Sequence, residues 1–445
     1  MIAVLTPAEM TAVDAAAPEP VDVLIHRAGG AVAQVAVDML DGAYGRRIVV
    51  IAGPGNNGAD GRDAARRLDA RGARCTVLDA KDLPSTLPRC DLVIDAAYGT
   101  GFHGEWEPPD VGDVPVLAVD IPSGVDGLTG VADGHVLWAD RTITFAALKP
   151  GLLFADGAEH AGEIVVADIG LDVSGARVHV VTDDDVAAWL PVRPADAHKY
   201  HAAVWIVAGS PGMSGAASLA TRAAQRAGAG YVRLSTPGAM PESAPTEAVL
   251  RALPAERWAP TVLGDLDRFK AVAVGPGLGR GSDDDVRRLA CECTVPLVID
   301  GDGLTAIGRD LDGLAPDVVL TPHDGEYARL MGNAPADDRI AATRALAERA
   351  SATAVLKGEA MVVAAPDGEV LIVANGDARL ATAGTGDVLT GITVALLAQG
   401  LDPLHAAAAA AYLLGAASEL GFERGLVAGD LPELLPVVLG SPAMP

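Results

Sequence analysis

The sequence predicts an α/β fold with two domains, each built on a mostly parallel sheet that helices cover on both faces. Short apolar runs alternate along the chain with helix-forming segments, which is the pattern of strands joined by crossover helices. Glycine-rich turns follow several of these runs. The length of 445 residues also exceeds what a single hydrophobic core usually organises, so we expect two cores.

The composition is acidic and excludes several classes of function. The chain has 33 basic and 59 acidic residues, a formal net charge of −26, which argues against a nucleic-acid or anionic membrane surface. No apolar run reaches membrane-spanning length and the first residues lack a basic leader, so we expect a cytoplasmic protein. The four cysteines lack metal-ligand spacing and are expected to be reduced thiols.

The first domain is expected to open with two helices and a βαβ unit. In chain order, the expected elements are a helix capped by Thr6, a helix over residues 21–40, a strand over 47–52, a helix over 62–71 and a strand over 75–78. A linker with two prolines is expected at residues 191–200. We therefore expect domains at residues 1–190 and 201–445.

The crossover of the βαβ unit is rich in glycine and amides. Residues 53–58 spell G-x-G-x-x-G, and Asp79 follows about twenty residues on, which formally satisfies a dinucleotide fingerprint. We do not adopt that interpretation, because Asn56, Asn57 and Asp60 stand where a pyrophosphate would need bare backbone and positive charge. Their oxygens suit polar contacts and an alkali or alkaline-earth cation.

Two further strands of this domain end in carboxylates. Asp95 ends the apolar run 92–95, and Asp120 ends the run 116–120, closely followed by Ser123. Ligands of parallel sheets bind at the carboxyl ends of the strands, where these groups and Asn57 can converge. For any one aspartate alone, a solvated turn carboxylate is the better interpretation. The repeated placement favours a site.

With these motifs, residues 1 to about 180 resemble the NAD(P)H-hydrate epimerase domain, which implies a Rossmann-like three-layer α/β/α fold. The resemblance implies a potassium ion held by Asn57, Asp95 and Ser123, with Asp120 as the catalytic residue for proton transfer. Lys149 would offset phosphate charge, although an exposed strand-end lysine is the simpler interpretation. The implied contacts to the hydrated nucleotide are Asn56, Asn57, Gly58, Ala59, Asp60, Gly99, Thr100, Gly101, Phe102, His103, Gly104, Glu105 and Asp120.

The second domain repeats the strand, turn and helix pattern. Its expected strands are residues 203–208, 231–235, 271–274, 297–300 and 318–321, followed by a hairpin over residues 361–373. The chain contains no G-x-x-x-x-G-K-S/T stretch, so a P-loop nucleotide site is excluded.

The turn Gly384-Thr385-Gly386-Asp387 precedes an apolar helix-forming run from Val388. Its small residues allow backbone amides to surround an anion at the positive end of that helix. Asp387 would repel a phosphate, so its expected role is to accept a proton from a hydroxyl that is being phosphorylated. Taken alone, the glycines could equally shape an ordinary turn, with Asp387 as the favourable N-terminal charge.

Together with the strand end at Lys357-Gly358, this turn is the layout of ribokinase-like phosphotransferases, and the second domain resembles the ADP-dependent NAD(P)H-hydrate dehydratase over residues 195–440. The resemblance implies that Ala217, Gly277, His323 and Asp387 contact the hydrated dinucleotide. It also implies adenine-nucleotide contacts from Lys357, Gly358, Glu359, Ala360, Met361, Gly384, Thr385 and Gly386. For His323, a helix cap or core histidine is the alternative interpretation.

The two resemblances imply repair of hydrated nicotinamide nucleotides, NADHX and NADPHX. The first domain would interconvert R and S epimers, and the second would use ADP, with Mg²⁺ as a helper, to dehydrate the S epimer with Asp387 as catalytic base. We expect a homo-oligomer that binds small molecules rather than nucleic acid or membrane. A ribokinase-like vitamin or sugar kinase with a non-catalytic N-terminal binding domain is the alternative.

Overall fold

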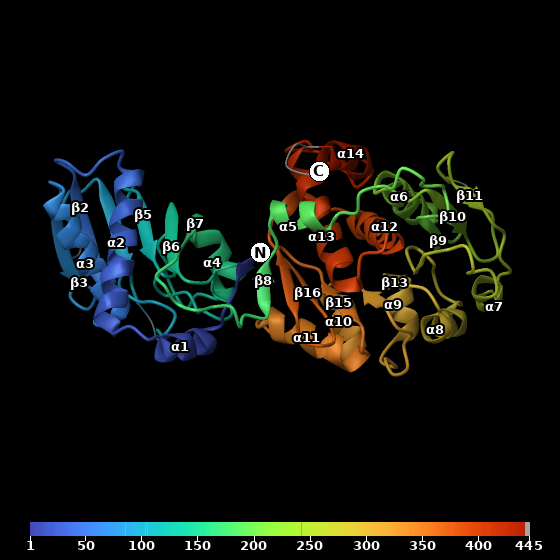
Figure 1. Ribbon diagram of the computed structural model, residues 1–445, viewed down its shortest axis with the longest axis horizontal. Helices are drawn as coiled ribbons and strands as arrows, with labels where there is room; N and C mark the ends of the chain where they lie inside the picture. Colours follow the sequence, from blue (N-terminus) through green and yellow to red (C-terminus); the bar gives the residue numbers. More distant parts are fainter. Residues whose placement is uncertain (85, 103, 105, 242, 441–445) are drawn as a thin grey trace. The chain divides into compact units, whose positions relative to one another are not determined.

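The computed structural model describes residues 1–440 apart from residues 85, 103, 105 and 242. The chain forms two compact units, Ile2–Val178 and His179–Pro445, and Met1 belongs with the second. In Figure 1 the first unit runs from blue to green and the second from green to red. Each unit has its own buried core.

The first unit is a parallel sheet with the strand order β3-β2-β4-β5-β6-β7. Ile48 and Val50 pack in one buried cluster, and Val49 and Ile51 in another, so both faces are covered. Helices α2 and α3 pack side by side (Figure 1). The elements are β1 (Ile2–Ala3), α1 (Pro7–Ala16), α2 (Val21–Met39), β2 (Arg47–Ala52), α3 (Asn56–Ala70), β3 (Arg74–Asp79), β4 (Leu92–Ala96), β5 (Val116–Val119), β6 (Arg141–Phe145), a 3₁₀ turn (Pro150–Leu152), α4 (Ala155–His160) and β7 (Glu163–Ala167). The short strand β8 (Val178–Val180) spans the boundary between the units.

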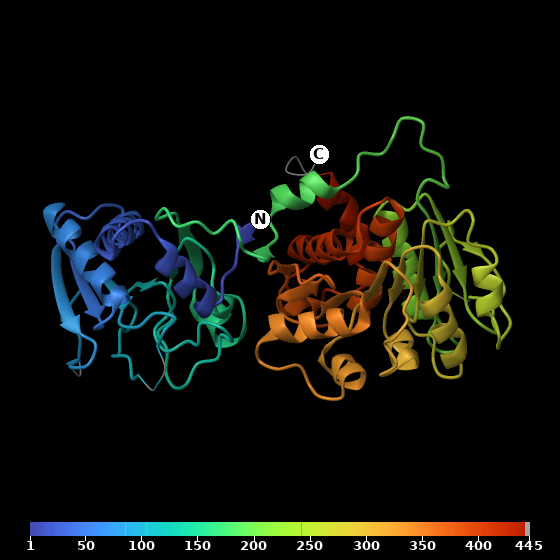
Figure 2. The same ribbon diagram turned by 60° about the horizontal axis from the view of Figure 1, so that its bottom comes forward.

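The second unit carries a larger sheet that includes the order β17-β16-β15-β14-β13-β12-β9-β10-β11. Its pairs are parallel except those that β16 makes with β15 and β17. In Figure 2 the red helices α12 and α13 and the orange helices α10 and α11 lie on opposite faces of this sheet. The two units therefore have the α/β fold class that the sequence predicts.

The strands and helices of the second unit follow one another in the expected alternation. They are α5 (Asp183–Trp189), β9 (Ala203–Val207), α6 (Ser214–Arg226), β10 (Tyr231–Ser235), β11 (Val249–Leu250), α7 (Ala259–Leu263), β12 (Ala271–Val274), α8 (Asp283–Glu292), β13 (Leu297–Ile299), α9 (Asp302–Ile307), β14 (Val318–Leu320), α10 (Asp324–Met331), α11 (Arg339–Ala350), β15 (Thr353–Leu356), β16 (Met361–Ala364), β17 (Val370–Val373), a 3₁₀ turn (Ala378–Leu380), α12 (Thr385–Ala398), α13 (Pro403–Glu419) and α14 (Leu431–Leu439).

The division between the units falls earlier than the expected linker at residues 191–200. The chain joins the second unit from His179, because the Val181 amide donates to the Ile372 carbonyl, 3.0 Å away. Val186 on α5 is fully buried in that unit's core, and Trp189 makes an edge contact with His405 on α13. Helix α5 is therefore part of the second unit rather than the end of the first.

Helix α3 begins at Asn56, earlier than the sequence predicts. Gly58 packs so closely on Gly53 that a Cβ on Gly58 would lie 1.9 Å from the Gly53 carbonyl oxygen. This contact between backbones requires glycine, and it turns the chain into a helix directly after β2. Asn56, Asn57 and Asp60 consequently project from the first turns of a helix instead of from a loop.

Among the described residues, no helix is both long and apolar enough to cross a membrane.

Candidate active sites

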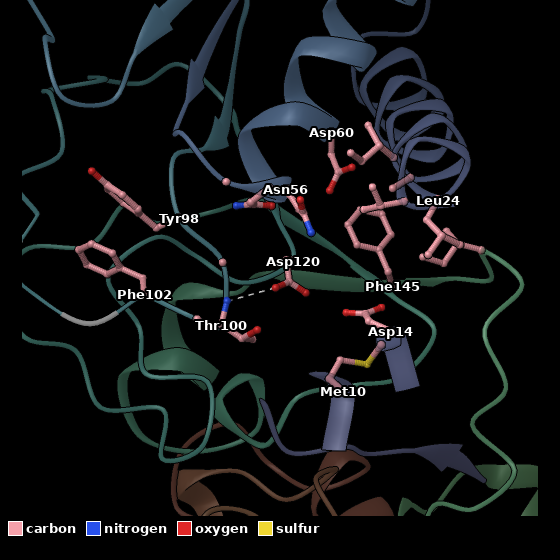
Figure 3. Close-up of a pocket in the computed structure, with 18 of the residues that line it drawn as sticks. Met10, Asp14, Leu24, Asn56, Asp60, Tyr98, Thr100, Phe102, Asp120 and Phe145 are labelled. Atoms are coloured by element: carbon pink, nitrogen blue, oxygen red, sulfur yellow. Dashed lines mark hydrogen bonds between the residues drawn. The ribbon is translucent and has the colours of Figure 1, made fainter. Parts of the chain in front are cut away.

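A cavity of about 590 Å³ lies at the carboxyl ends of β2, β4 and β5 in the first unit. Figure 3 shows its polar side chains, which come from α3, from the segment after β4 and from the turn after β5. Several predicted contact residues line it: Asn56, Asn57, Asp60, Gly99, Thr100, Gly101, Phe102 and Asp120. The strand ends thus converge as the sequence predicts.

Other predicted contact residues are absent from the described cavity wall. Gly58 serves the contact with Gly53, and Ala59 and Gly104 do not line the cavity. His103 and Glu105 lie outside the described residues.

Asp120 directly follows β5 in a strained backbone conformation, with a φ of 71°. Its Oδ1 lies 2.8 Å from the ammonium nitrogen of Lys149, and its Oδ2 accepts from the Thr100 amide at 3.2 Å (Figure 3). Burial raises the pKa of Asp120, but the Lys149 ammonium and the Thr100 amide outweigh it and lower the pKa overall. Asp120 is therefore an anion at neutral pH. A φ in this region is costly for a non-glycine residue, so the surrounding contacts must hold the turn in this conformation.

Lys149 is buried, which overturns the exposed strand-end interpretation. Its ammonium group donates to the Thr144 hydroxyl at 2.8 Å and to the Phe145 carbonyl at 3.1 Å, besides pairing with Asp120. These three partners occupy the donors of an ammonium group. Lys149 therefore holds Asp120 in place, and the offset of phosphate charge that the resemblance implies stays a prediction.

Asp60 behaves in the opposite way to Asp120. Its side chain is buried and points into the cavity (Figure 3), and burial, followed by the charges of Asp120, Asp63 and Asp14, raises its pKa to about 8. Asp60 is therefore mostly protonated at pH 7. Asp14 on α1 also lines this cavity, and partial burial raises its pKa. No sequence motif marks Asp14, because only the folding of α1 against the sheet brings it here.

Of the proposed cation ligands, Asn57 lines the cavity, and Asp95 and Ser123 bond to each other. The Ser123 hydroxyl donates to Asp95 Oδ1 at 2.7 Å and the Ser123 amide donates to Oδ2 at 2.9 Å, and both side chains are fully buried. Both amide atoms of Asn57 are buried without a hydrogen-bond partner among the described residues. An orphaned buried amide oxygen is costly unless a ligand satisfies it. Carboxylate, hydroxyl and amide oxygens are hard ligands of the kind that alkali and alkaline-earth cations take.

A second cavity, of about 550 Å³, lies in the second unit beside the start of α12. Its wall contains residues from the segment after β15, from the start of β16 and from α13. The predicted contact residues that line it are His323, Lys357, Gly358, Glu359, Met361, Thr385 and Gly386. Ala360 is buried and does not line it.

The Gly384 to Asp387 segment stands between this cavity and α6. Helix α12 begins at Thr385, so Thr385, Gly386 and Asp387 form its first turn, where backbone amides lack intrahelical partners. A Cβ on Gly384 would lie 2.6 Å from Leu219 on α6, and a Cβ on Gly386 would lie 3.1 Å from the Lys357 ammonium nitrogen. The turn is therefore an anion-binding geometry with a cation beside it.

The predicted dinucleotide contacts Ala217 and Gly277 lie together on the α6 side. A Cβ on Gly277 would be 2.9 Å from Ala216, the neighbour of Ala217 in the first turn of α6. Ala217 is buried, and neither residue lines the second cavity. Ala217 and Gly277 thus lie apart from the predicted adenine-nucleotide contacts, whereas His323 lies among them in the second cavity wall.

Asp387 has a pKa raised to about 7 by burial and then by the nearby carboxylate of Asp300, with Lys357 partly offsetting the rise. Burial disfavours the charged form of Lys357, but Asp300 and Glu326 outweigh it and raise the lysine pKa. A carboxylate with a pKa near neutrality suits a general base. No sequence motif marks Asp300, which enters the site only through the fold.

His323 caps α10. Its Nδ1 accepts from the amides of Gly325 and Glu326, while Glu326 accepts from the His323 amide. This is the capping role named as the alternative interpretation. The ring is also part of the second cavity wall, so substrate contact stays a prediction.

Comparison with known families agrees with both domains. A family model described as NAD(P)H-hydrate dehydratase matches residues 204–438. A second, described as YjeF-related protein N-terminus, matches residues 21–85 and 78–151. Among solved structures, an ADP/ATP-dependent NAD(P)H-hydrate dehydratase from Bacillus subtilis, co-crystallised with ATP and Mg²⁺, is 31% identical with a TM-score of 0.50. The match covers 58% of this chain and 96% of the Bacillus subtilis chain.

A ribokinase-like protein from Enterococcus faecalis matches with a TM-score of 0.52 and 23% identity, over 59% of this chain and 95% of that protein. This likeness confirms the fold of the second unit. Among curated relatives, the bifunctional NAD(P)H-hydrate repair enzyme of Salinibacter ruber is 36% identical, covering 89% of this chain and 88% of its own length. The Escherichia coli enzyme of the same name is 34% identical, covering 92% and 87%. The chain thus belongs to the family of bifunctional NAD(P)H-hydrate repair enzymes.

Proposed function

We propose that this chain repairs hydrated nicotinamide nucleotides, epimerising R and S forms of NADHX and NADPHX in the first unit and dehydrating the S form with ADP in the second. The observation that carries the proposal is Asp387, which has a pKa of about 7 in the first turn of α12, one residue from the glycine packed against the Lys357 ammonium. A base, an amide turn and a cation in one place are what phosphoryl transfer to a hydroxyl requires.

The dehydration follows from the chemistry of the hydrate. Water added to the ring leaves a hydroxyl group on a saturated carbon, and hydroxide is a poor leaving group. Asp387 accepts the hydroxyl proton as the terminal phosphoryl group of ADP moves to that oxygen, and the amides of the turn and Lys357 stabilise the charge in flight. Phosphate then leaves, the adjacent carbon loses a proton, and the dihydropyridine is restored.

The epimerisation uses the two tuned carboxyl groups of the first cavity. The hydroxyl group is on a carbon bonded to the ring nitrogen, so that nitrogen can share electrons when the carbon changes configuration. The C–O bond breaks as the lone pair of that nitrogen forms a C=N bond, and the protonated Asp60 donates its proton to the leaving hydroxide. Water then adds to the opposite face of the C=N bond, and Asp120, held as an anion by Lys149, accepts the proton of that water. Two groups with opposite protonation states at one pH support acid and base roles in one cavity.

Two cations complete the proposal. Asn57, Asp95 and Ser123 would hold K⁺ and so fix the turns that carry Asn56 and Asp120, which supplies positioning rather than bond making. In the second unit, Mg²⁺ would neutralise nucleotide phosphate charge, and co-crystallisation of the Bacillus subtilis dehydratase with ATP and Mg²⁺ supports this role. We also propose a cytoplasmic location and a homo-oligomeric state for the chain.

The deciding experiment measures recovery of the reduced-nicotinamide absorbance from a mixture of R and S NADHX with Mg²⁺, K⁺ and either ADP or ATP. Full recovery with ADP is expected. Asp120→Asn should lower the epimerisation rate by roughly 10²–10⁴-fold, so that only the S fraction is recovered quickly. A stable phosphorylated product without NADH would identify a small-molecule kinase instead and contradict the proposal.

A further inference from the structure

Asp300 is a buried carboxylate directly after β13, and it belongs to neither predicted set of substrate or nucleotide contacts. Its Oδ1 accepts from the Thr321 hydroxyl at 2.7 Å and from the Lys357 ammonium at 2.6 Å. Its Oδ2 accepts from the Thr390 hydroxyl at 3.0 Å. Three donors from three different segments therefore converge on one side chain.

The partners of Asp300 belong to the parts of the site that must stay in register. Lys357 follows β15, and a Cβ on Gly386 would lie 3.1 Å from its ammonium nitrogen. Thr390 is a fully buried residue of α12, one turn after Asp387. Asp300 thus bonds both to the cation beside the amide turn and to the helix that carries the base.

We propose that Asp300 is a positioning residue for the phosphoryl transfer, which fixes the Lys357 ammonium against Gly386 and ties it to the helix that carries Asp387. This inference rests on the proposed function of the second unit. A lysine side chain has many rotamers. The ion pair with the Asp300 carboxylate limits Lys357 to the rotamer in which its ammonium meets the transferring phosphoryl group. A neutral residue at position 300 would leave that ammonium free to swing away.

The ion pair of Asp300 and Lys357 also changes the pKa of Asp387, which an uncharged structural residue at position 300 would not do. The charges that act on Asp387 are the carboxylates of Asp300 and Asp302, which raise its pKa, and Lys357, which lowers it; Glu326 faces Lys357 in turn. Removing the charge of Asp300 lowers the pKa of Asp387. Removing the charge of Lys357 raises it. The two variants therefore shift the base in opposite directions.

The test uses the full chain with S-NADHX, ADP and Mg²⁺, and it measures kcat and the nucleotide KM across pH. For Asp300→Asn we expect kcat to fall by roughly 10²-fold, as for loss of one transition-state donor, with a smaller change in KM. The acid limb of the profile should move to lower pH. Lys357→Met should also lower kcat, but with the acid limb moved to higher pH.

The double variant decides whether Asp300 acts through Lys357. If it does, Asp300→Asn/Lys357→Met should be no more than about threefold slower than Lys357→Met alone, because the second change removes nothing further. Asp300→Asn alone leaves the Lys357 ammonium buried without its anion, which can prevent folding. The double variant removes this ammonium, so it can be measured even if Asp300→Asn alone does not fold. A cooperative thermal transition establishes that each variant is folded.

Three results distinguish failure of the inference from failure of the proposed function. Wild-type kcat with an unshifted acid limb in folded Asp300→Asn would overturn the inference, and so would losses that multiply in the double variant. Both outcomes leave the proposed function standing. A wild-type chain that recovers no NADH with ADP would overturn the proposed function itself, and this inference with it.

Discussion

Asp120 lies at the carboxyl end of β5, and Asp387 lies in the first turn of α12. Their neighbours shift the pKa values of these two carboxyl groups in opposite directions. Lys149, with its other donors occupied, lowers the pKa of Asp120, whereas burial and Asp300 raise that of Asp387 to about 7. The first group is an anion throughout the neutral range. The second changes its charge within it, so the two activities should respond differently to pH.

The dehydration rate should therefore depend on pH near 7. Asp387 must be deprotonated to accept the hydroxyl proton, and its pKa is about 7, so the rate should fall about tenfold per pH unit below that value. The epimerisation rate in the same preparation should lack this limb, because the pKa of Asp120 is lowered. A dehydration rate independent of pH between about 5.5 and 8, measured with S-NADHX and saturating ADP, would contradict the assignment of Asp387 as base.

Asn57 and Asn56 offer a matched pair for the cation site. Both line the first cavity, but only Asn57 has buried amide atoms without a partner among the described residues. Asn57→Ala should raise the K⁺ concentration for half-maximal epimerisation by roughly tenfold or more, as loss of a ligand does. Asn56→Ala should leave that concentration unchanged while weakening substrate binding. Equal K⁺ titration curves for the two variants would remove Asn57 from the proposed ligand set.

At the scale of elements, the start of α3 requires glycine at position 58, whereas position 55 has room for a side chain. A Cβ on Gly58 would lie 1.9 Å from the Gly53 carbonyl oxygen, whereas one on Gly55 meets nothing within 4 Å. Gly58 is thus required where helix and strand backbones touch. The three polar groups at the start of α3 depend on that contact for their direction.

Gly58→Ala should destabilise the first unit by about 1–3 kcal/mol, because the helix must move away from β2 to admit the methyl group. Gly55→Ala should change its stability by less than about 0.5 kcal/mol. The check is urea titration followed by residual epimerase activity, with dehydratase activity of the same sample as the internal reference. Equal midpoints for the two variants would show that α3 does not need its close approach to Gly53.

At the scale of the whole molecule, each unit has a separate core. Cores of this size are sufficient for domains to fold alone. We expect a fragment of residues 1–178 to retain epimerase activity and a fragment of residues 179–445 to dehydrate S-NADHX. Mixing the two fragments should restore full recovery from an R and S mixture. A fragment that lacks a cooperative unfolding transition would show that the units depend on each other for stability.

Much of this organisation could be predicted from local sequence. The strand at residues 47–52 and the helix capped by Thr6 follow from apolar runs and capping residues that act within a few positions. The convergence of Asp120 and Asn57 follows from the rule that ligands bind at the carboxyl ends of parallel strands. The start of α3 was missed, because it depends on a contact between Gly58 and Gly53 rather than on propensity.

The sequence by itself determined the α/β class, the two-domain organisation and the family, because alternation, strand-end motifs and glycine turns are local patterns. Only the tertiary structure decided the state of each carboxyl group. Asp60 is protonated because burial and the charges of three other carboxyl groups raise its pKa. Asp120 is an anion because the ammonium group of Lys149 pairs with it from another segment of the chain. A pKa depends on the solvent and charges within a few ångströms, and folding brings these together from distant parts of the chain.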